Sequence, residues 1–135
     1  MRKLSITHPA RSDLTDIRRY TIDRYGRAGA DAYDALLKQA IRDVWEDPFR
    51  PGSRERPEIG ASIRSYHSAL SRERAASEVK SPRHFILYFL PHDDEVVISR
   101  VLHDSRDPAR HIPGGHLEMA RDSAPTKDRG GERKR

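Results

Sequence analysis

The apolar residues in the first part of the chain recur at helical spacing. Over residues 10–25 they are three or four residues apart, and over residues 33–44 they occupy positions i, i+3, i+4, i+7, i+8 and i+11. Gly26 and Gly29 interrupt the pattern and offer a helix end. Because few residues separate the two segments, we expect an antiparallel helical hairpin that ends at Asp47-Pro48.

The remaining apolar segments have the pattern of strands. Residues 4–7 and 62–67 each form a short run with strand-like alternation. Residues 84–90 are apolar at successive positions and rich in aromatics, which is typical of a central strand. A turn with Pro and Asp at residues 91–95 joins this segment to the apolar residues 96–102. We therefore predict a β-hairpin at the end of the folded part.

Two segments between these elements are polar. Residues 49–60 contain prolines and glycines and are predicted to be a loop, whereas residues 70–82 are expected to be an extended loop or a short helix. The order β, α, α, β, β, β predicts the α+β class. A helical hairpin would pack on one face of a small antiparallel sheet, and both apolar surfaces would then be buried.

The chain has 135 residues, 35% of them charged, and a net charge of +5. Residues 113–135 hold six basic and four acidic residues but few large apolar ones, so we predict a disordered tail after a single domain at residues 1–112. The predicted domain holds 20 basic and 17 acidic residues. The tail thus supplies +2 of the net charge and the domain +3, and a domain this mildly basic is not marked as nucleic-acid-binding by its charge.

Several classes of protein are excluded or disfavoured by composition. The chain has no cysteine, which excludes disulfides, cysteine-ligated metals and a thiol nucleophile. The seven histidines lack the spacing of a metal site, and no glycine-rich phosphate loop is present, so we predict no metal and no cofactor. No apolar run approaches the roughly 18 residues that span a bilayer, and the first residues do not have the pattern of a signal peptide. We expect a cytoplasmic protein without a membrane partner.

Charged and imidazole side chains gather at or just after the last predicted strand. Guanidinium groups and imidazoles on a small sheet can contact phosphates, and imidazole suits proton transfer near neutral pH. Alternatively, arginines and aspartates in this stretch pair with each other and fasten the C-terminal segment, and both interpretations stay open. The cluster comprises Arg100, His103, Asp104, Arg106, Asp107, Arg110 and His111, with Arg64 and His84 from neighbouring strands.

At these residues the chain resembles the ParE branch of the RelE/ParE superfamily, the toxins of type II toxin–antitoxin modules. The resemblance runs from Leu4 to Ile112, and its most specific part is residues 83–89 followed by residues 98–111. The superfamily fold, a helical hairpin on a sheet, agrees with the elements predicted above. Supporting residues earlier in the chain are His8-Pro9-Ala10, Asp13-Leu14, Ile17, Tyr33, Leu37 and residues 63–66.

The resemblance implies a toxin that a small ParD-like antitoxin neutralises in a hetero-oligomer. Such an antitoxin usually supplies the DNA-binding domain, so contact with DNA would be indirect. ParE-like toxins generally poison DNA gyrase. On this basis we expect the antitoxin to bind beside the helical hairpin, at Leu14, Ile17, Tyr33 and Leu37. We expect the target to contact Arg100, His103, Arg106, Arg110 and His111.

RelE-like relatives instead cut mRNA on the ribosome, usually with a C-terminal tyrosine. Here no tyrosine follows Tyr88, and His84 stands where such toxins commonly carry an arginine. These features favour the gyrase-directed branch and a toxin that is not an enzyme. If the chain were a nuclease, its catalytic residues would come from Arg64, Arg83, His84, His103, Arg106 and His111. A third alternative is an inactive relative that only binds antitoxin. The connection between His67 and Arg83 is longer than is typical of the family.

Overall fold

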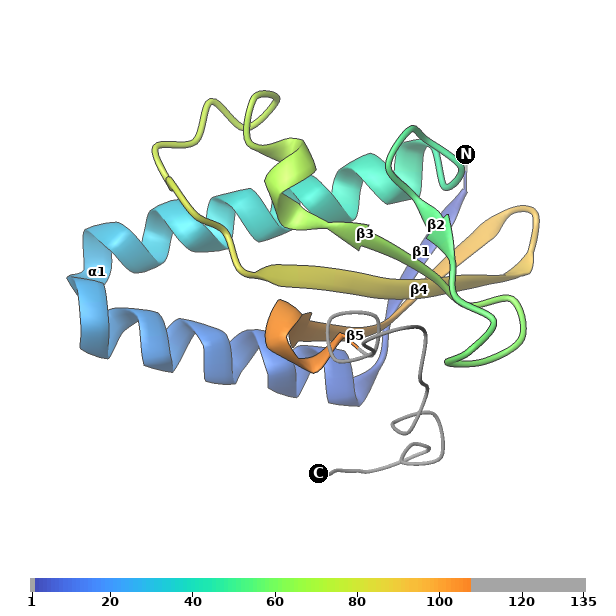
Figure 1. Ribbon diagram of the computed structural model, residues 1–135, viewed down its shortest axis with the longest axis horizontal. Coiled ribbons are helices and arrows are strands. Elements are labelled where there is room, and N and C mark those ends of the chain that lie inside the picture. Colours follow the sequence, from blue (N-terminus) through green and yellow to red (C-terminus); the bar gives the residue numbers. More distant parts are fainter. Residues whose placement is uncertain (1, 108–135) are drawn as a thin grey trace, which may run out of the picture.

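The computed structural model describes residues 2–107 and contains one long helical element and a five-stranded sheet (Figure 1). The predicted tail at residues 113–135 lies outside the described residues, as do Arg110 and His111. The elements in chain order are β1 (Lys3–Ile6), α1 (His8–Glu46), β2 (Arg54–Glu55), β3 (Arg64–His67), the 3-10 turn η1 (Ser68–Ser71), β4 (His84–His92), β5 (Glu95–His103) and the 3-10 turn η2 (Asp104–Arg106).

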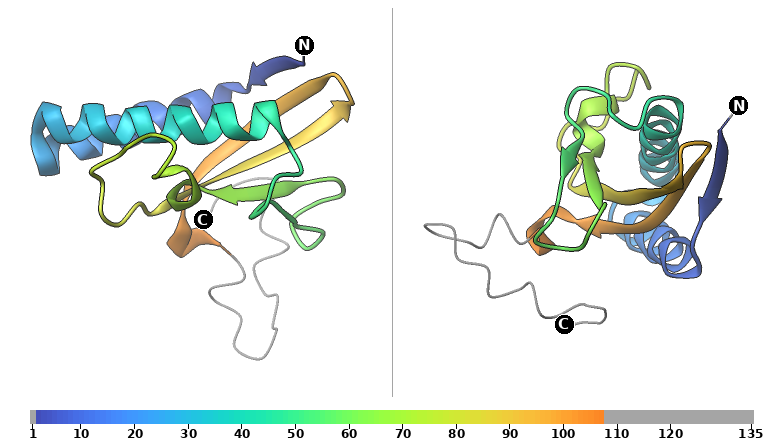
Figure 2. Two further views of the ribbon diagram at one scale, coloured as in Figure 1. Left: turned by 90° about the horizontal axis from the view of Figure 1, so that it is seen from above. Right: turned by 90° about the vertical axis from the view of Figure 1, so that its right-hand side faces the viewer.

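Helix α1 is a helical hairpin, as the sequence predicts. The Thr7 hydroxyl caps its N-terminus by accepting a hydrogen bond from the Ala10 amide at 3.1 Å. Gly26 has φ 79° and ψ 178°, a conformation that only glycine adopts readily, and it breaks α1 into two helical halves. The halves run side by side in opposite directions (Figures 1 and 2). Gly29 is helical, and the second half ends at Glu46, directly before Asp47.

The sheet has the strand order β1-β5-β4-β3-β2. The predicted hairpin of β4 and β5 is confirmed, and β3 adds to β4 antiparallel. The prediction of an antiparallel sheet is wrong at one edge, because β1 pairs with β5 in parallel and the sheet is mixed. Lys3 donates to the carbonyl of Asp94 and Thr7 to that of Ile98. The alternation in a four-residue strand predicts that it is a strand. It does not predict whether the strand pairs parallel or antiparallel with a strand as distant in sequence as β5.

Only the first of the two predicted polar segments differs from the observed structure. The first contains β2, two residues that pair antiparallel with β3 at the other sheet edge. The second begins with η1 and then continues through turns to the start of β4, without a further helix among its residues, all of which are described. Strand β2 has exposed side chains and is too short to produce a hydrophobic period in the sequence.

The core lies between α1 and one face of the sheet (Figure 2). From α1 it receives chiefly the second helical half, including Leu37, Ala40 and Val44, and from the sheet Ile86 and Tyr88 among others. This packing holds the ends of β3, β4 and β5 next to the hairpin, where polar side chains gather. Within the described residues, α1 is not apolar enough to cross a membrane.

Candidate functional site

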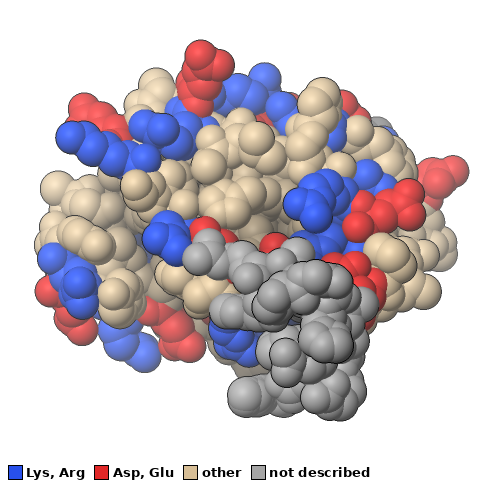
Figure 3. All heavy atoms as spheres, viewed as in Figure 1, with Lys and Arg blue, Asp and Glu red and all other residues tan. Residues whose placement is uncertain are grey.

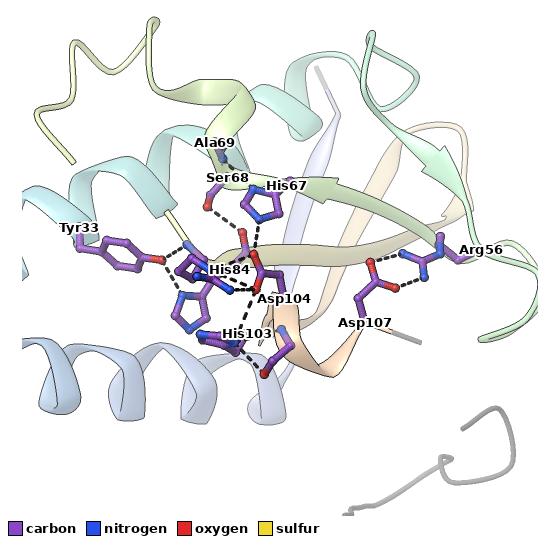
Figure 4. Close-up of polar contacts among 11 residues, drawn as sticks. Tyr33, Arg56, His67, Ser68, Ala69, His84, His103, Asp104 and Asp107 are labelled. Atoms are coloured by element: carbon purple, nitrogen blue, oxygen red, sulfur yellow. Dashed lines mark hydrogen bonds and ion pairs between the residues drawn. The ribbon is translucent and has the colours of Figure 1, made fainter. Parts of the chain in front are cut away.

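Three histidines lie together where β3 ends, β4 begins and β5 ends (Figure 4). His84 and His103 are register partners, and their ring centroids are 5.3 Å apart in an edge-to-face arrangement. His67 reaches the same place from the neighbouring strand. We call these residues, with Asp104 and Arg83, the strand-end cluster. The sequence predicted all of its members except His67.

Asp104 is the common partner within the strand-end cluster. Its carboxylate accepts hydrogen bonds from Arg83 at 3.1–3.2 Å, and His67 Nε2 lies 3.2 Å from it. His103 Nδ1 lies 3.7 Å away. Burial would raise the pKa of Asp104, but the hydrogen bonds from Arg83 and His67 outweigh it, and the pKa is lowered. One carboxylate therefore organises the surrounding cationic and imidazole groups.

His84 is the inner member of the strand-end cluster and is held by Tyr33. The Tyr33 hydroxyl accepts a hydrogen bond from the Arg83 amide at 2.9 Å and lies 2.6 Å from His84 Nδ1. Its proton is then best placed to be donated to His84, whose Nδ1 acts as acceptor. Burial and the neighbouring His103 lower the pKa of His84 to about 4. At neutral pH this imidazole is uncharged, so it does not supply a cation for phosphate.

Two other residues that the sequence places near a site have structural partners elsewhere. The Arg100 guanidinium forms a two-pronged salt bridge with Asp13 on α1, at 2.7 and 2.8 Å. Arg64 Nε donates to the Ser53 hydroxyl at 2.8 Å, and its guanidinium stacks 4.8 Å from the ring centroid of Phe49. Arg64 begins β3, whereas His67 ends it, so Arg64 does not belong to the strand-end cluster.

The segment after β5 is also fastened by an arginine that no pattern in the sequence marks. Arg56 forms a salt bridge through Nη2 to Asp107 (Figure 4), and a second one through Nε to Glu58 at 2.7 Å. One of the two interpretations left open above pairs Asp104 and Asp107 with Arg106 and Arg110, and it stays a prediction because Arg110 lies outside the described residues. The structure shows that both carboxylates also bind arginines that lie far away in sequence, Arg83 for Asp104 and Arg56 for Asp107.

The four residues expected to contact an antitoxin are only partly at the surface. Tyr33 and Leu37 belong to the core, with exposed fractions of 9% and 1%, while Leu14 and Ile17 are half-buried against it. Tyr33 therefore serves the strand-end cluster rather than a surface groove. Antitoxin contact at the four residues stays a prediction. Because Tyr33 and Leu37 are buried, an antitoxin would touch the residues that cover them and not these two side chains directly.

The charges on the face shown in Figure 3 alternate in sign rather than forming one basic patch. Among residues 2–107, no group of three or more histidine or acidic side chains is arranged to hold a metal ion. What the strand-end cluster offers chemically is a pair of half-buried imidazoles, on His67 and His103, on either side of one carboxylate. Such a pair can move protons or make directional contacts with a partner.

Comparisons with known proteins agree with this architecture. Residues 4–108 match the family described as ParE toxin of type II toxin–antitoxin system, parDE. Among solved structures, the chain is similar to the chromosomal ParDE TA system from P. aeruginosa, with a TM-score of 0.57 and 16% identity. The match covers 76% of this chain and 96% of that one, and at this identity it shows the fold alone. No curated protein matches the chain.

Proposed function

The chain belongs to the family of ParE toxins of type II toxin–antitoxin systems, and from this premise we propose that it stops growth by poisoning DNA gyrase. A ParD-like antitoxin would neutralise it in a hetero-oligomer, and only that antitoxin would contact DNA. Both proteins would act in the cytoplasm, where gyrase works. The toxin would act through protein contact and not as an enzyme.

One observation favours a toxin that acts by binding its target over one that cleaves RNA. Two groups of the predicted nuclease set already have partners within the molecule: Arg83 is paired with Asp104, and His84 is bound by Tyr33. His84 is also neutral at physiological pH, because its pKa is lowered to about 4. Cleavage of a phosphodiester needs groups that stabilise negative charge and transfer protons. A cluster whose cation is neutralised by its own carboxylate supports a binding surface better than a catalytic centre.

We infer that the target contacts the exposed turn after β5, with His103 and Arg106 as the described members of that surface. Arg110 and His111 would extend it along the chain. Arg100 would contribute through its effect on the fold, because Asp13 already binds its guanidinium. The antitoxin would lie along the first half of α1, next to the half-buried Leu14 and Ile17.

The test is a gyrase assay with the purified full chain. Increasing toxin should abolish supercoiling of relaxed plasmid or accumulate cleaved DNA–gyrase complex. Pre-incubation with the product of a neighbouring antitoxin reading frame should restore activity. Normal supercoiling at saturating toxin without antitoxin would overturn the proposal.

A ribosome-dependent endoribonuclease is the second candidate, favoured by the placement of His67 and His103 around Asp104. Mapping mRNA 5′ ends in a translating extract separates the two functions, because only a nuclease creates new ends inside codons. The variant His103→Asn should remove these ends if the imidazole transfers a proton. A chain that leaves gyrase, message and growth unchanged would be an inactive relative that only binds antitoxin.

A further inference from the structure

Arg56 is the most deeply buried cation among the described residues, with an exposed fraction of 1%. Its guanidinium makes four hydrogen bonds: Nε to Glu58, Nη1 to the Ser65 hydroxyl at 3.1 Å and to Asp107 Oδ2 at 3.3 Å, and Nη2 to Asp107 Oδ1. Burial lowers the pKa of Arg56, but the bonds to Asp107 and Glu58 outweigh it and leave the pKa raised. The side chain is therefore always charged.

The main chain around Arg56 is equally well held. The Arg56 amide donates to the carbonyl of Ile63 at 2.8 Å, and the Arg56 carbonyl accepts from Ile59 and Gly60. The guanidinium thus projects from a closed loop between β2 and β3. It connects that loop and the adjoining strand β3 to the segment after β5, which lies 51 positions away in sequence at Asp107.

These contacts fix the turn η2 from both ends. At its start, Asp104 donates its amide to the Arg83 carbonyl at 2.6 Å and pairs with the Arg83 side chain. At its end, Asp107 donates its amide to the carbonyl of Asp104 at 3.1 Å and pairs with Arg56. Between the two fixed carboxylates lie Ser105 and Arg106, both exposed. Figure 4 shows Asp104 and Asp107 held from separate places.

From this geometry we propose that Arg56 is a positioning residue for target recognition. By holding Asp107, it sets the orientation of η2 and hence of Arg106. The inference rests on the proposed function, in which this segment contacts gyrase. Arg56 itself touches no target.

A purely stabilising role explains the chemistry of this pair less well. Burying two charges gives little net stability, and a well-packed apolar pair of similar volume is often as good. What the two-pronged arginine–carboxylate contact supplies is a defined orientation, because the planar fork accepts a carboxylate in one plane. Orientation matters most where a neighbouring side chain must meet a partner.

The experiment compares Arg56→Met, Asp107→Asn and the double variant with wild-type full chain in the gyrase assay. Arg74→Met is the matched control, because it also removes an arginine bound to a carboxylate, Asp43, but in the segment between η1 and β4 and without a contact to Asp107. Amide hydrogen exchange over residues 104–107 and over β4 is measured on each variant. Asp107→Asn keeps the size of the side chain and one acceptor oxygen for Arg56, so it should stay folded even where Arg56→Met does not.

We expect Arg56→Met and Asp107→Asn each to raise the half-inhibitory toxin concentration at least tenfold, and the double variant no further than the worse single one. Exchange should accelerate at residues 104–107 and stay slow in β4, while Arg74→Met should inhibit within twofold of wild type. Folded variants that inhibit like wild type would overturn the inference and leave the proposed function standing. If wild type does not inhibit gyrase, the proposed function fails. Growth inhibition on expression then decides: loss with Arg56→Met but not with Arg74→Met supports the positioning role, and equal toxicity overturns it.

Discussion

Asp13 on α1 and Arg100 on β5 form a two-pronged salt bridge beside the part of β5 that has no neighbouring strand on the β1 side. The pairing of β1 with β5 ends at Ile98. Beyond that point, the Asp13 carboxylate accepts hydrogen bonds from Arg100 Nε and Nη2 and also from the Val101 amide at 2.9 Å. Asp13 thus replaces the missing strand neighbour and connects the first helical half to β5.

We expect Asp13→Ala to lower the free energy of unfolding by about 2–3 kcal/mol, because it leaves both a partly buried guanidinium and a strand amide without an acceptor. Asp13→Asn should lose less, since the amide oxygen can still accept from Val101. Urea unfolding monitored by circular dichroism measures both.

Asp16→Ala is the control for Asp13. Asp16 lies one turn later in α1 and pairs with Arg19 at 3.6 Å, with both side chains about three-quarters exposed. Such a pair contributes little, so the change should stay under about 0.5 kcal/mol. Equal losses in the two alanine variants would show that the contact with β5 does not stabilise the fold.

Much of the fold could be predicted because its elements have strong local signals. The 3.6-residue period and Gly26 predict the helical hairpin, and the long apolar segments on either side of a Pro-Asp turn predict β4 and β5. The parallel placement of β1 could not be predicted, since it depends on backbone contacts with residues about 90 positions away. Strand β2 is too short for any period.

The location of the site could be predicted from the sequence better than the hydrogen bonds and salt bridges within it. Arg83, His84, His103 and Asp104 were found because they gather around the last two strands in the sequence. Arg56 was missed because an arginine in a polar, proline-containing loop has no hydrophobic pattern that marks it as buried. The pairing of Arg100 with Asp13 was missed for a related reason: both residues carry ordinary surface charges, and only the fold brings them together.

A second buried carboxylate, on Asp43, anchors the segment between η1 and β4. Asp43 is fully buried and accepts hydrogen bonds from Ser71 at 2.5 Å, from Gln39 at 2.8 Å and from Arg74 at 2.8 Å. Ser71→Ala should cost about 1–2 kcal/mol, because one oxygen of a buried carboxylate loses its donor. It should also speed tryptic cleavage after Arg72 and Arg74, since η1 would be held less firmly to α1.

The control for Ser71 is Ser105→Ala, which removes an exposed hydroxyl from η2. It should leave both the urea midpoint and the cleavage at Arg72 and Arg74 unchanged. Cleavage that is no faster in Ser71→Ala than in wild type would mean that this segment is held by other contacts.

His84 makes stability depend on pH in a defined window. Its pKa is about 4 in the folded protein and about 6.5 when unfolded, so the unfolded chain binds the proton first as the pH falls. The stability that neutral His84 provides is complete above pH 6.5 and declines between pH 6.5 and 4, by up to about 3 kcal/mol. The lowered pKa of Asp104 acts in the same direction, but only below its unfolded value of 3.8.

Urea midpoints between pH 7 and pH 4 test the role of His84. His84→Asn should flatten the profile in this window, since the group that takes up the proton on unfolding is gone. His92→Asn is the control, because His92 is exposed near the tip of the β4–β5 hairpin and should leave the slope as in wild type. A slope that survives in His84→Asn would assign the pH dependence to other groups.

The kink at Gly26 allows the two halves of α1 to pack side by side. With φ 79° and ψ 178°, the residue lies in a region that is essentially restricted to glycine, and no heavy atom lies within 4 Å of where a Cβ would stand. Gly26→Ala should therefore lower the free energy of unfolding by about 1–3 kcal/mol through backbone strain and not through a clash. Asn tolerates the left-handed helical region but not this one, so Gly26→Asn should be about as unstable as Gly26→Ala in urea unfolding. A Gly26→Asn variant close to wild type in stability would show that the connection adopts an ordinary left-handed turn in solution.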